Sequence, residues 1–145
     1  MSWKPDQRKT LARLHRLQAE RMAITNLRER IELIISQEDG LRAQRLDGDH
    51  VSGSSGNHQE ERLVNTISKL DDSYRTLKEK MFDVNEVERS LLSLTSVERQ
   101  VITRLDINRE ARAVERLIDE LGYSQASIYR IRRKAVENLT IMLFP

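Results

Sequence analysis

The sequence predicts an all-α protein, in which a long N-terminal antiparallel helical hairpin of coiled-coil type precedes a C-terminal helix-turn-helix domain. Charged residues make up 33% and aromatic residues 4% of the 145 residues, a balance typical of elongated helices rather than of a thick globular core. Apolar residues recur at three- and four-residue steps along two long stretches, as in helices with one buried face. We assign residues 1–93 to the hairpin and residues 94–145 to the helix-turn-helix domain.

The first helix is expected from about Asp6, which follows Pro5 as its cap, to Glu38, and the second from about Glu60 to Leu94. Neither helix can bury its apolar stripe alone, because isolated helices are only marginally stable in water. The two helices are therefore expected to pack on each other, on a second copy of the chain or on a partner. The apolar positions are Leu14, Leu17, Ile24, Leu27, Ile31 and Ile35 in the first helix, and Ile67, Leu70, Tyr74, Leu77, Met81, Val84, Val87 and Leu91 in the second.

A Ser/Gly-rich loop is expected between these helices at about residues 40–59, where four glycines and clustered serines interrupt the helical period. The segment is long for a hairpin turn, so part of it could contact a ligand, but a flexible connector is the favoured interpretation. His50 and His58 share this loop with Asp47 and Asp49, and a solvated loop is favoured over a metal site there.

No residue pattern predicts an enzyme, a metal site or a cofactor. The adjacent Asp71 and Asp72 point to different faces of a helix, which makes them a poor catalytic pair. The glycines of the 40–59 loop lack the lysine and the preceding strand of a phosphate-binding loop. We therefore expect a binding protein without catalytic residues, metal or cofactor.

A third helix is expected to begin at Thr95, because the letters TSVE form a capping box. In this motif the Thr95 hydroxyl accepts a hydrogen bond from the Glu98 amide, and the Glu98 side chain returns one to the Thr95 amide. A loop or short extension through Ile107 and Asn108 is expected to follow. The inward-facing residues of this helix are Val101, Ile102 and Leu105.

The final segment, LIDELGYSQASIYRIRRKAVENL, has the spacing of a helix-turn-helix. Gly122 is expected to end the first helix in the left-handed conformation, and Ser124 is expected to cap the second. Ile128, Ile131, Ala135 and Leu139 recur at three- and four-residue steps and point inward. The opposite face is polar, aromatic and basic, as reading the major groove of DNA requires; its residues are Gln125, Ala126, Tyr129, Arg130 and Arg133.

These residues also carry a resemblance to known proteins. The segments LTSVERQVITRLD and VERLIDELGYSQASIYRIRRKAVENL resemble the fourth region of sigma factors, their C-terminal DNA-reading domain. The resemblance is closer to ArpU and RinA-like phage late transcription regulators, which join a helical N-terminal half to a sigma-like tail. The resemblance implies a sequence-specific regulator of phage or prophage late genes that binds double-stranded DNA.

The resemblance also implies the roles of individual residues on the last helix. The chain departs from sigma-like tails at Ile118, where they usually carry a small residue, and at Leu105 and Asp106, where they usually carry an arginine followed by an aromatic residue. The implied base-facing residues are Gln125, Ala126, Ser127, Tyr129 and Arg130, and the implied phosphate contacts are Arg132, Arg133 and Lys134.

The charge distribution agrees with a nucleic-acid partner at one end of the chain. Residues 99–145 carry nine Lys/Arg and six Asp/Glu, whereas residues 47–98 carry six and eleven. The N-terminal helices are expected to form a homodimer or to meet RNA polymerase. No apolar run could cross a membrane, and the absence of cysteine suits the cytoplasm of a bacterial host.

Two other functions remain open from the sequence. A phage DNA-packaging protein of the small-terminase type also combines a helix-turn-helix with coils, although its DNA-reading part usually comes first. A polymerase- or sigma-binding adaptor would use the same tail to contact protein, and its basic cluster would be incidental.

Overall fold

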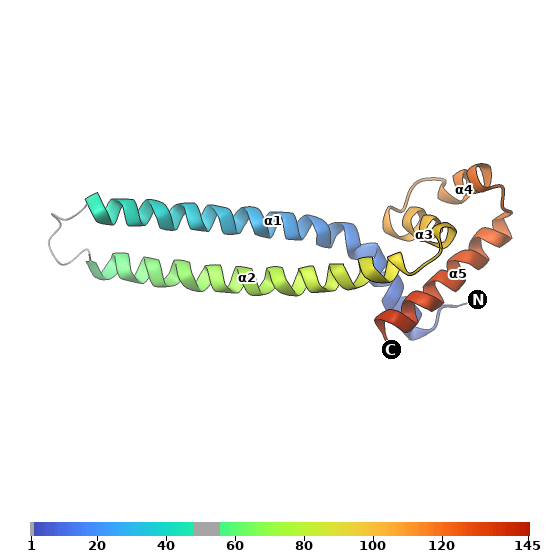
Figure 1. Cartoon of the computed structure of the whole chain (residues 1–145), viewed down its shortest axis with the longest axis horizontal. Coiled ribbons are helices and arrows are strands. Elements are labelled where there is room, and N and C mark those ends of the chain that lie inside the picture. Colours follow the sequence, from blue (N-terminus) through green and yellow to red (C-terminus); the bar gives the residue numbers. More distant parts are fainter. Residues whose placement is uncertain (1, 48–55) are drawn as a thin grey trace. The chain divides into compact units, whose positions relative to one another are not determined.

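The computed structural model describes residues 2–47 and 56–145, and it contains no strand in these ranges. The prediction of an all-α protein is confirmed for these residues. Five α-helices and one π-helical turn follow each other in the described ranges (Figure 1). They are α1 (Pro5–Asp47), α2 (Gly56–Leu92), α3 (Ser96–Ile102), the π-helical turn η1 (Thr103–Ile107), α4 (Ala113–Leu121) and α5 (Gln125–Leu143).

The two long helices extend further than predicted. Helix α1 continues to Asp47 instead of ending near Glu38, and α2 begins at Gly56 instead of near Glu60. The predicted 40–59 loop is therefore wrong at both edges, because a single helical glycine such as Gly40 costs only about 1 kcal/mol relative to alanine. Residues 48–55, including His50 and Asp49, lie outside the described residues.

The start of α1 also differs from the prediction. Proline is favoured at the first helical position because its fixed φ suits a helix and its missing amide hydrogen is not needed there. Helix α1 accordingly begins at Pro5, and Asp6 lies in its first turn rather than at its cap. The Gln7 Oε1 atom accepts a hydrogen bond of 3.0 Å from the Lys4 amide, which is the reciprocal half of a capping box.

Contacts divide the chain into two compact units. We call Met1–Arg21 together with Phe82–Pro145 the terminal unit, and Met22–Met81 the central unit. This division does not coincide with the predicted boundary between residues 93 and 94, because the first residues of α1 pack with the C-terminal helices.

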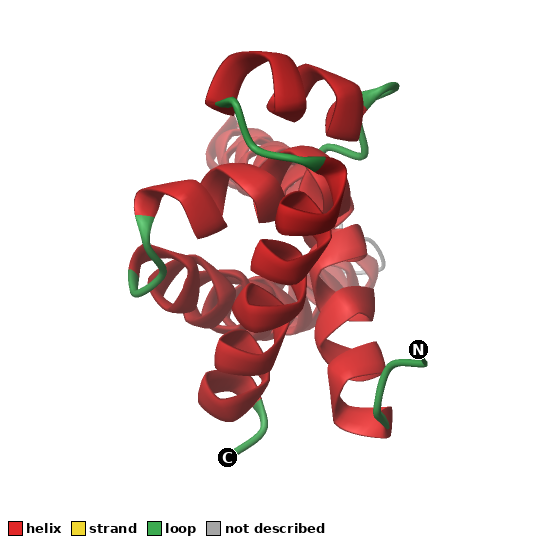
Figure 2. Ribbon diagram, turned by 90° about the vertical axis from the view of Figure 1, so that its right-hand side faces the viewer, coloured by secondary structure: helices red, strands yellow, loops and turns green. Residues whose placement is uncertain are grey.

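The core of the terminal unit forms where α5 packs against α3 and α4 (Figure 2). Its centre is the cluster of Val101, Leu117 and Ile128, one residue from each helix, all fully buried. Ile118, the departure from the sigma-like pattern, is partly buried against this cluster. The first half of α1 adds Leu14, which is also fully buried.

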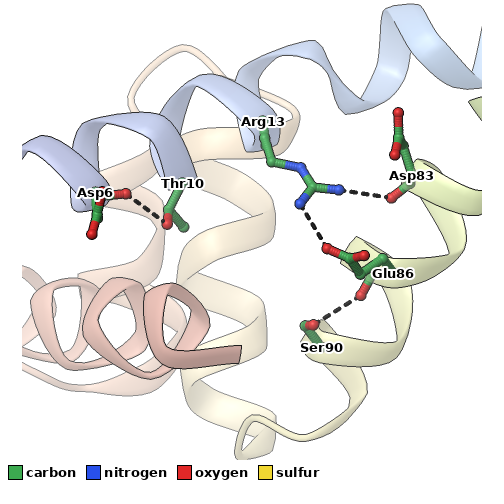
Figure 3. Close-up of polar contacts among 6 residues, drawn as sticks. All are labelled: Asp6, Thr10, Arg13, Asp83, Glu86 and Ser90. Carbon is green, nitrogen blue, oxygen red and sulfur yellow. Dashed lines mark hydrogen bonds and ion pairs between the residues drawn. The ribbon is translucent and has the colours of Figure 1, made fainter. Parts of the chain in front are cut away.

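Polar contacts join α1 and α2 within the terminal unit (Figure 3). Arg13 donates from Nη1 to Glu86 Oε1 at 2.9 Å and from Nη2 to the Asp83 carbonyl at 3.1 Å. The Glu86 carbonyl in turn accepts from the Ser90 hydroxyl at 2.8 Å. Arg13 therefore fixes the side of α2 that faces α1 in this unit.

The central unit has few buried apolar residues. Ile24 and Ile31 of α1 and Leu77 of α2 are buried there, as the predicted seams require. Ile67 and Tyr74, two other seam positions, remain 43% and 41% exposed. The spacing of apolar residues therefore predicted which side of each helix faces inward but not how deeply that side is buried.

Candidate nucleic-acid interface

The predicted turn between α4 and α5 has the expected local geometry. Gly122 adopts φ 73°, in the left-handed region, and its amide donates to the Ile118 carbonyl at 2.9 Å, which ends α4. The Ser124 hydroxyl accepts a hydrogen bond of 3.2 Å from the Ser127 amide, which caps α5. Both predicted caps are confirmed, and only three residues separate Leu121 from the first residue of α5.

Of the capping box predicted for α3, the Thr95 half is confirmed, whereas the Glu98 side chain bonds to Asn138 instead of to the Thr95 amide. The Thr95 hydroxyl accepts a hydrogen bond of 3.2 Å from the Glu98 amide. The Glu98 side chain is buried, and its Oε2 accepts a bond of 3.4 Å from Asn138 Nδ2 on α5. Glu98 thus connects α3 to the helix that carries the predicted DNA contacts.

Helix α5 presents two different faces. Its buried face includes Ile128, Ala135 and Leu139 as predicted, together with Val136, which the apolar spacing did not single out. Ile131 is only partly buried. Of the predicted base-facing residues Ser127 is partly buried, and those that are exposed are Gln125, Ala126, Tyr129 and Arg130.

Of the predicted phosphate contacts, Arg132 is partly buried and is paired with a carboxylate. Its Nη2 and Nε donate to the two carboxylate oxygens of Asp106 at 2.6 and 3.0 Å, and Asp106 is fully buried. His15 Nε2 lies 3.4 Å from Asp106 Oδ1. Since the bidentate pair uses two of the five guanidinium N–H donors, a phosphate contact by Arg132 would rest on Nη1 and on the second hydrogen of Nη2.

Sequence reasoning missed the role of Asp106. A loop or short extension was expected through Ile107 and Asn108, and the chain there continues α3 as the π-helical turn η1, in which the Asn108 amide donates to the Thr103 carbonyl at 2.8 Å. The available signal was a lone carboxylate between the apolar residues Leu105 and Ile107. Its partner Arg132 lies 26 residues away, which no local pattern reveals.

Arg104 joins the same turn to α4. Its Nη2 lies 2.7 Å from Glu120 Oε2, and its Nε lies 3.9 Å from Glu110 Oε2. The hydrogen bond to Glu120, reinforced by the charges of both carboxylates, raises the pKa of the Arg104 guanidinium above its ordinary value, although burial opposes this shift. This arginine is therefore a structural cation rather than a free contact for DNA.

Arg133 and Lys134, the other predicted phosphate contacts, lie in different surroundings. Lys134 is exposed. Arg133 is partly buried, and its Cζ lies 4.7 Å from the centre of the Trp3 ring. Trp3 therefore folds back onto α5. With Tyr129 and the two neighbouring arginines it lines a hollow of about 260 Å³.

No group of His, Cys, Asp or Glu side chains that could hold a metal ion occurs among the residues that the structure describes. Within the same residues, no helix is both long and apolar enough to span a membrane. The candidate site is the exposed polar face of α5, whose opposite face packs on the apolar core of the terminal unit.

Neither a model of a known protein family, nor a curated protein, nor a solved structure matches this chain.

Proposed function

We propose that the protein is a sequence-specific DNA-binding transcription regulator. In this proposal α4, the three-residue turn and α5 form a helix-turn-helix, and α1 and α2 form an antiparallel hairpin. The observation that carries it is the exposed start of α5, where Gln125, Ala126, Tyr129 and Arg130 project from a helix capped by Ser124. A rigid helix with exposed polar residues in its first two turns suits insertion into a major groove.

The chemistry of these side chains suits base recognition. Arg130 can donate two hydrogen bonds to a guanine, Gln125 can pair with an adenine, and the Ala126 methyl can contact the methyl of thymine. Arg133 and Lys134 neutralise phosphates, so affinity falls as salt rises. By resemblance, the regulated genes are late genes of a phage or prophage.

The hairpin supplies the second element of the proposal. It dimerises the protein or contacts RNA polymerase, which would bring the polymerase to the promoter. The half-exposed Ile67 and Tyr74 on α2 lie at seam positions that a second copy or a partner helix could cover.

The test is recovery of bound fragments from a randomised pool of duplex DNA at near-physiological salt. We expect enrichment of a defined motif by the unmodified chain. Arg130→Ala should relax the preference at the contacted base by about 1–3 kcal/mol, whereas Lys134→Ala should weaken binding to all sequences alike. An unchanged motif with Arg130→Ala would show that another face of α5 reads the bases.

An adaptor that binds polymerase or a sigma factor is the second candidate. The same exposed apolar positions, Ile67 and Tyr74, favour it because they offer a protein-binding surface on the central unit. Retention of RNA polymerase by the immobilised chain, without enrichment of any DNA motif and with loss on replacing both residues by lysine, would favour this function over the first.

A further inference from the structure

We propose that Trp3 positions Arg133 and that Trp3, Arg133 and Tyr129 together form a binding site for one backbone phosphate of duplex DNA. The inference rests on the proposed function, and it adds the segment before α1 to the DNA-binding surface. Neither the helix-turn-helix pattern nor the resemblance to sigma factors includes this segment.

The guanidinium groups of Arg132 and Arg133 both lie over the Trp3 ring. The Trp3 ring centre lies 4.7 Å from Arg133 Cζ and 5.4 Å from Arg132 Cζ. A guanidinium that stacks on an aromatic ring uses its flat face, so the N–H donors in its plane remain available for an anion. Stacking also limits the rotamers of the side chain, which reduces the entropy lost when an anion binds.

Arg132 and Arg133 differ in whether an acidic residue neutralises their charge. Arg132 already donates to Asp106 through Nε and Nη2, and its charge is balanced by that buried carboxylate. No hydrogen bond or ion pair joins Arg133 to another residue in the described ranges. Arg133 therefore brings to this surface a positive charge that the protein does not neutralise.

The residues that line the hollow beside Trp3 suit an anion. The hollow has a volume of about 260 Å³, and it is lined by Trp3, Tyr129, Arg132 and Arg133, with no carboxylate among these lining residues. The Tyr129 hydroxyl can donate a hydrogen bond to a phosphate oxygen. Two guanidinium groups and one phenol favour a small oxyanion over a neutral or cationic ligand.

The position of the hollow indicates the source of this oxyanion. Tyr129 and Arg133 are four residues apart and therefore lie on the same side of α5. The same helix carries the exposed Arg130 and Lys134. A helix seated in a major groove is flanked by the sugar-phosphate backbone, so the anion at its edge is a phosphodiester of the duplex.

The experiment uses Trp3 as its own reporter, since the full chain has one tryptophan. A duplex bearing the enriched motif is titrated into the full-length protein, while its binding is followed in parallel by the anisotropy of a labelled copy. We expect the tryptophan emission to change and to saturate together with the anisotropy. Trp3→Ala should weaken duplex binding about three- to tenfold, and Trp3→Phe should restore most of the loss because phenylalanine keeps an aromatic face.

Two controls separate positioning from a general effect on the fold. Trp3→Ala in an Arg133→Ala background should cause no further loss, because the residue that Trp3 positions is already absent. Phe82→Ala removes an exposed aromatic side chain of α2 that has no place in the proposed binding surfaces, and it should leave duplex affinity unchanged. Circular dichroism of each variant reports whether the helices are intact.

Other outcomes would overturn the inference in distinguishable ways. If the duplex binds Trp3→Ala as tightly as the unmodified chain, or more tightly, the inference fails while the proposed function stands. If inorganic phosphate alone gives the same emission change at the same concentration of phosphate groups, the assignment to duplex DNA is wrong. If no duplex binds to the unmodified chain, both the inference and the proposed function are wrong.

Discussion

The terminal and central units contain the same kind of helical apolar pattern but bury it to very different extents. Of the twenty buried apolar residues in the described ranges, only Ile24, Ile31 and Leu77 belong to the central unit. The most deeply buried side chains, such as Leu117 and Ile128, all lie in the terminal unit. A similar three- and four-residue spacing therefore leads to a closed core in one unit and a half-exposed seam in the other.

The number of neighbouring helices explains this difference. In the terminal unit α5 packs against α3 and α4, and α1 and α2 contribute buried residues as well, so apolar side chains are surrounded. The described residues of the central unit all belong to α1 and α2. Two helices can cover only a narrow strip of each other, and wider apolar stripes such as the one through Ile67 and Tyr74 remain partly in water.

The largest difference in stability loss between the two units should come from removing a charged side chain. Asp106→Ala removes the fully buried carboxylate of the terminal unit and leaves Arg132 without its partner. We expect the free energy of unfolding to fall by about 3–5 kcal/mol, because Arg132, whose side chain is only 23% exposed, keeps a charge without a partner. Urea denaturation followed by circular dichroism measures this change.

The matched control for charge is Asp71→Ala, at an exposed position on α2 in the central unit. Its effect on unfolding should stay within about 0.5 kcal/mol. Similar losses in both variants would contradict the contrast between the two units.

Apolar truncation should give the next largest difference. Ile128→Ala leaves a cavity in the cluster of the terminal unit, and we expect a loss of about 2–4 kcal/mol. Ile67→Ala makes the same chemical change at a position that is 43% exposed, so a loss below about 1 kcal/mol is expected. Equal losses in the same denaturation assay would indicate that Ile67 is covered in solution, for instance by a second copy.

Two glycines should give the smallest effects, and these should have opposite signs. Gly122→Ala places a side chain at φ 73°, which costs about 1 kcal/mol. Gly40→Ala lies in α1, with no atom near the added methyl group, and should stabilise that helix by about 0.5–1 kcal/mol. Thermal unfolding measures both, and a stabilising Gly122→Ala would show that α4 does not end in the left-handed conformation.

Local patterns predicted the local features of the structure. The left-handed Gly122 and the caps at Thr95 and Ser124 follow from residue preferences within one turn, so the sequence contained all that was needed. The prediction of the helix ends near residues 40–59 was less accurate, because a single glycine or serine weakens a helix without ending it.

The features that the sequence did not predict depend on distant residues. The pairing of Asp106 with Arg132 and the stacking of Trp3 on Arg133 join segments that are far apart in the chain. Apolar spacing within one helix contains no information about such partners. Arg132 therefore looked like any other member of a basic cluster, although it forms a buried ion pair.

The contact between Thr10 and Thr140 has a consequence for folding during synthesis. Their hydroxyl oxygens lie 2.8 Å apart although 130 residues separate them in sequence. The first turns of α1 leave the ribosome early, yet the helix on which they pack is made much later. Contacts of such long range slow folding. Until α5 has emerged, the apolar side chains in the first turns of α1 should therefore be covered by pairing with α2 or by a chaperone.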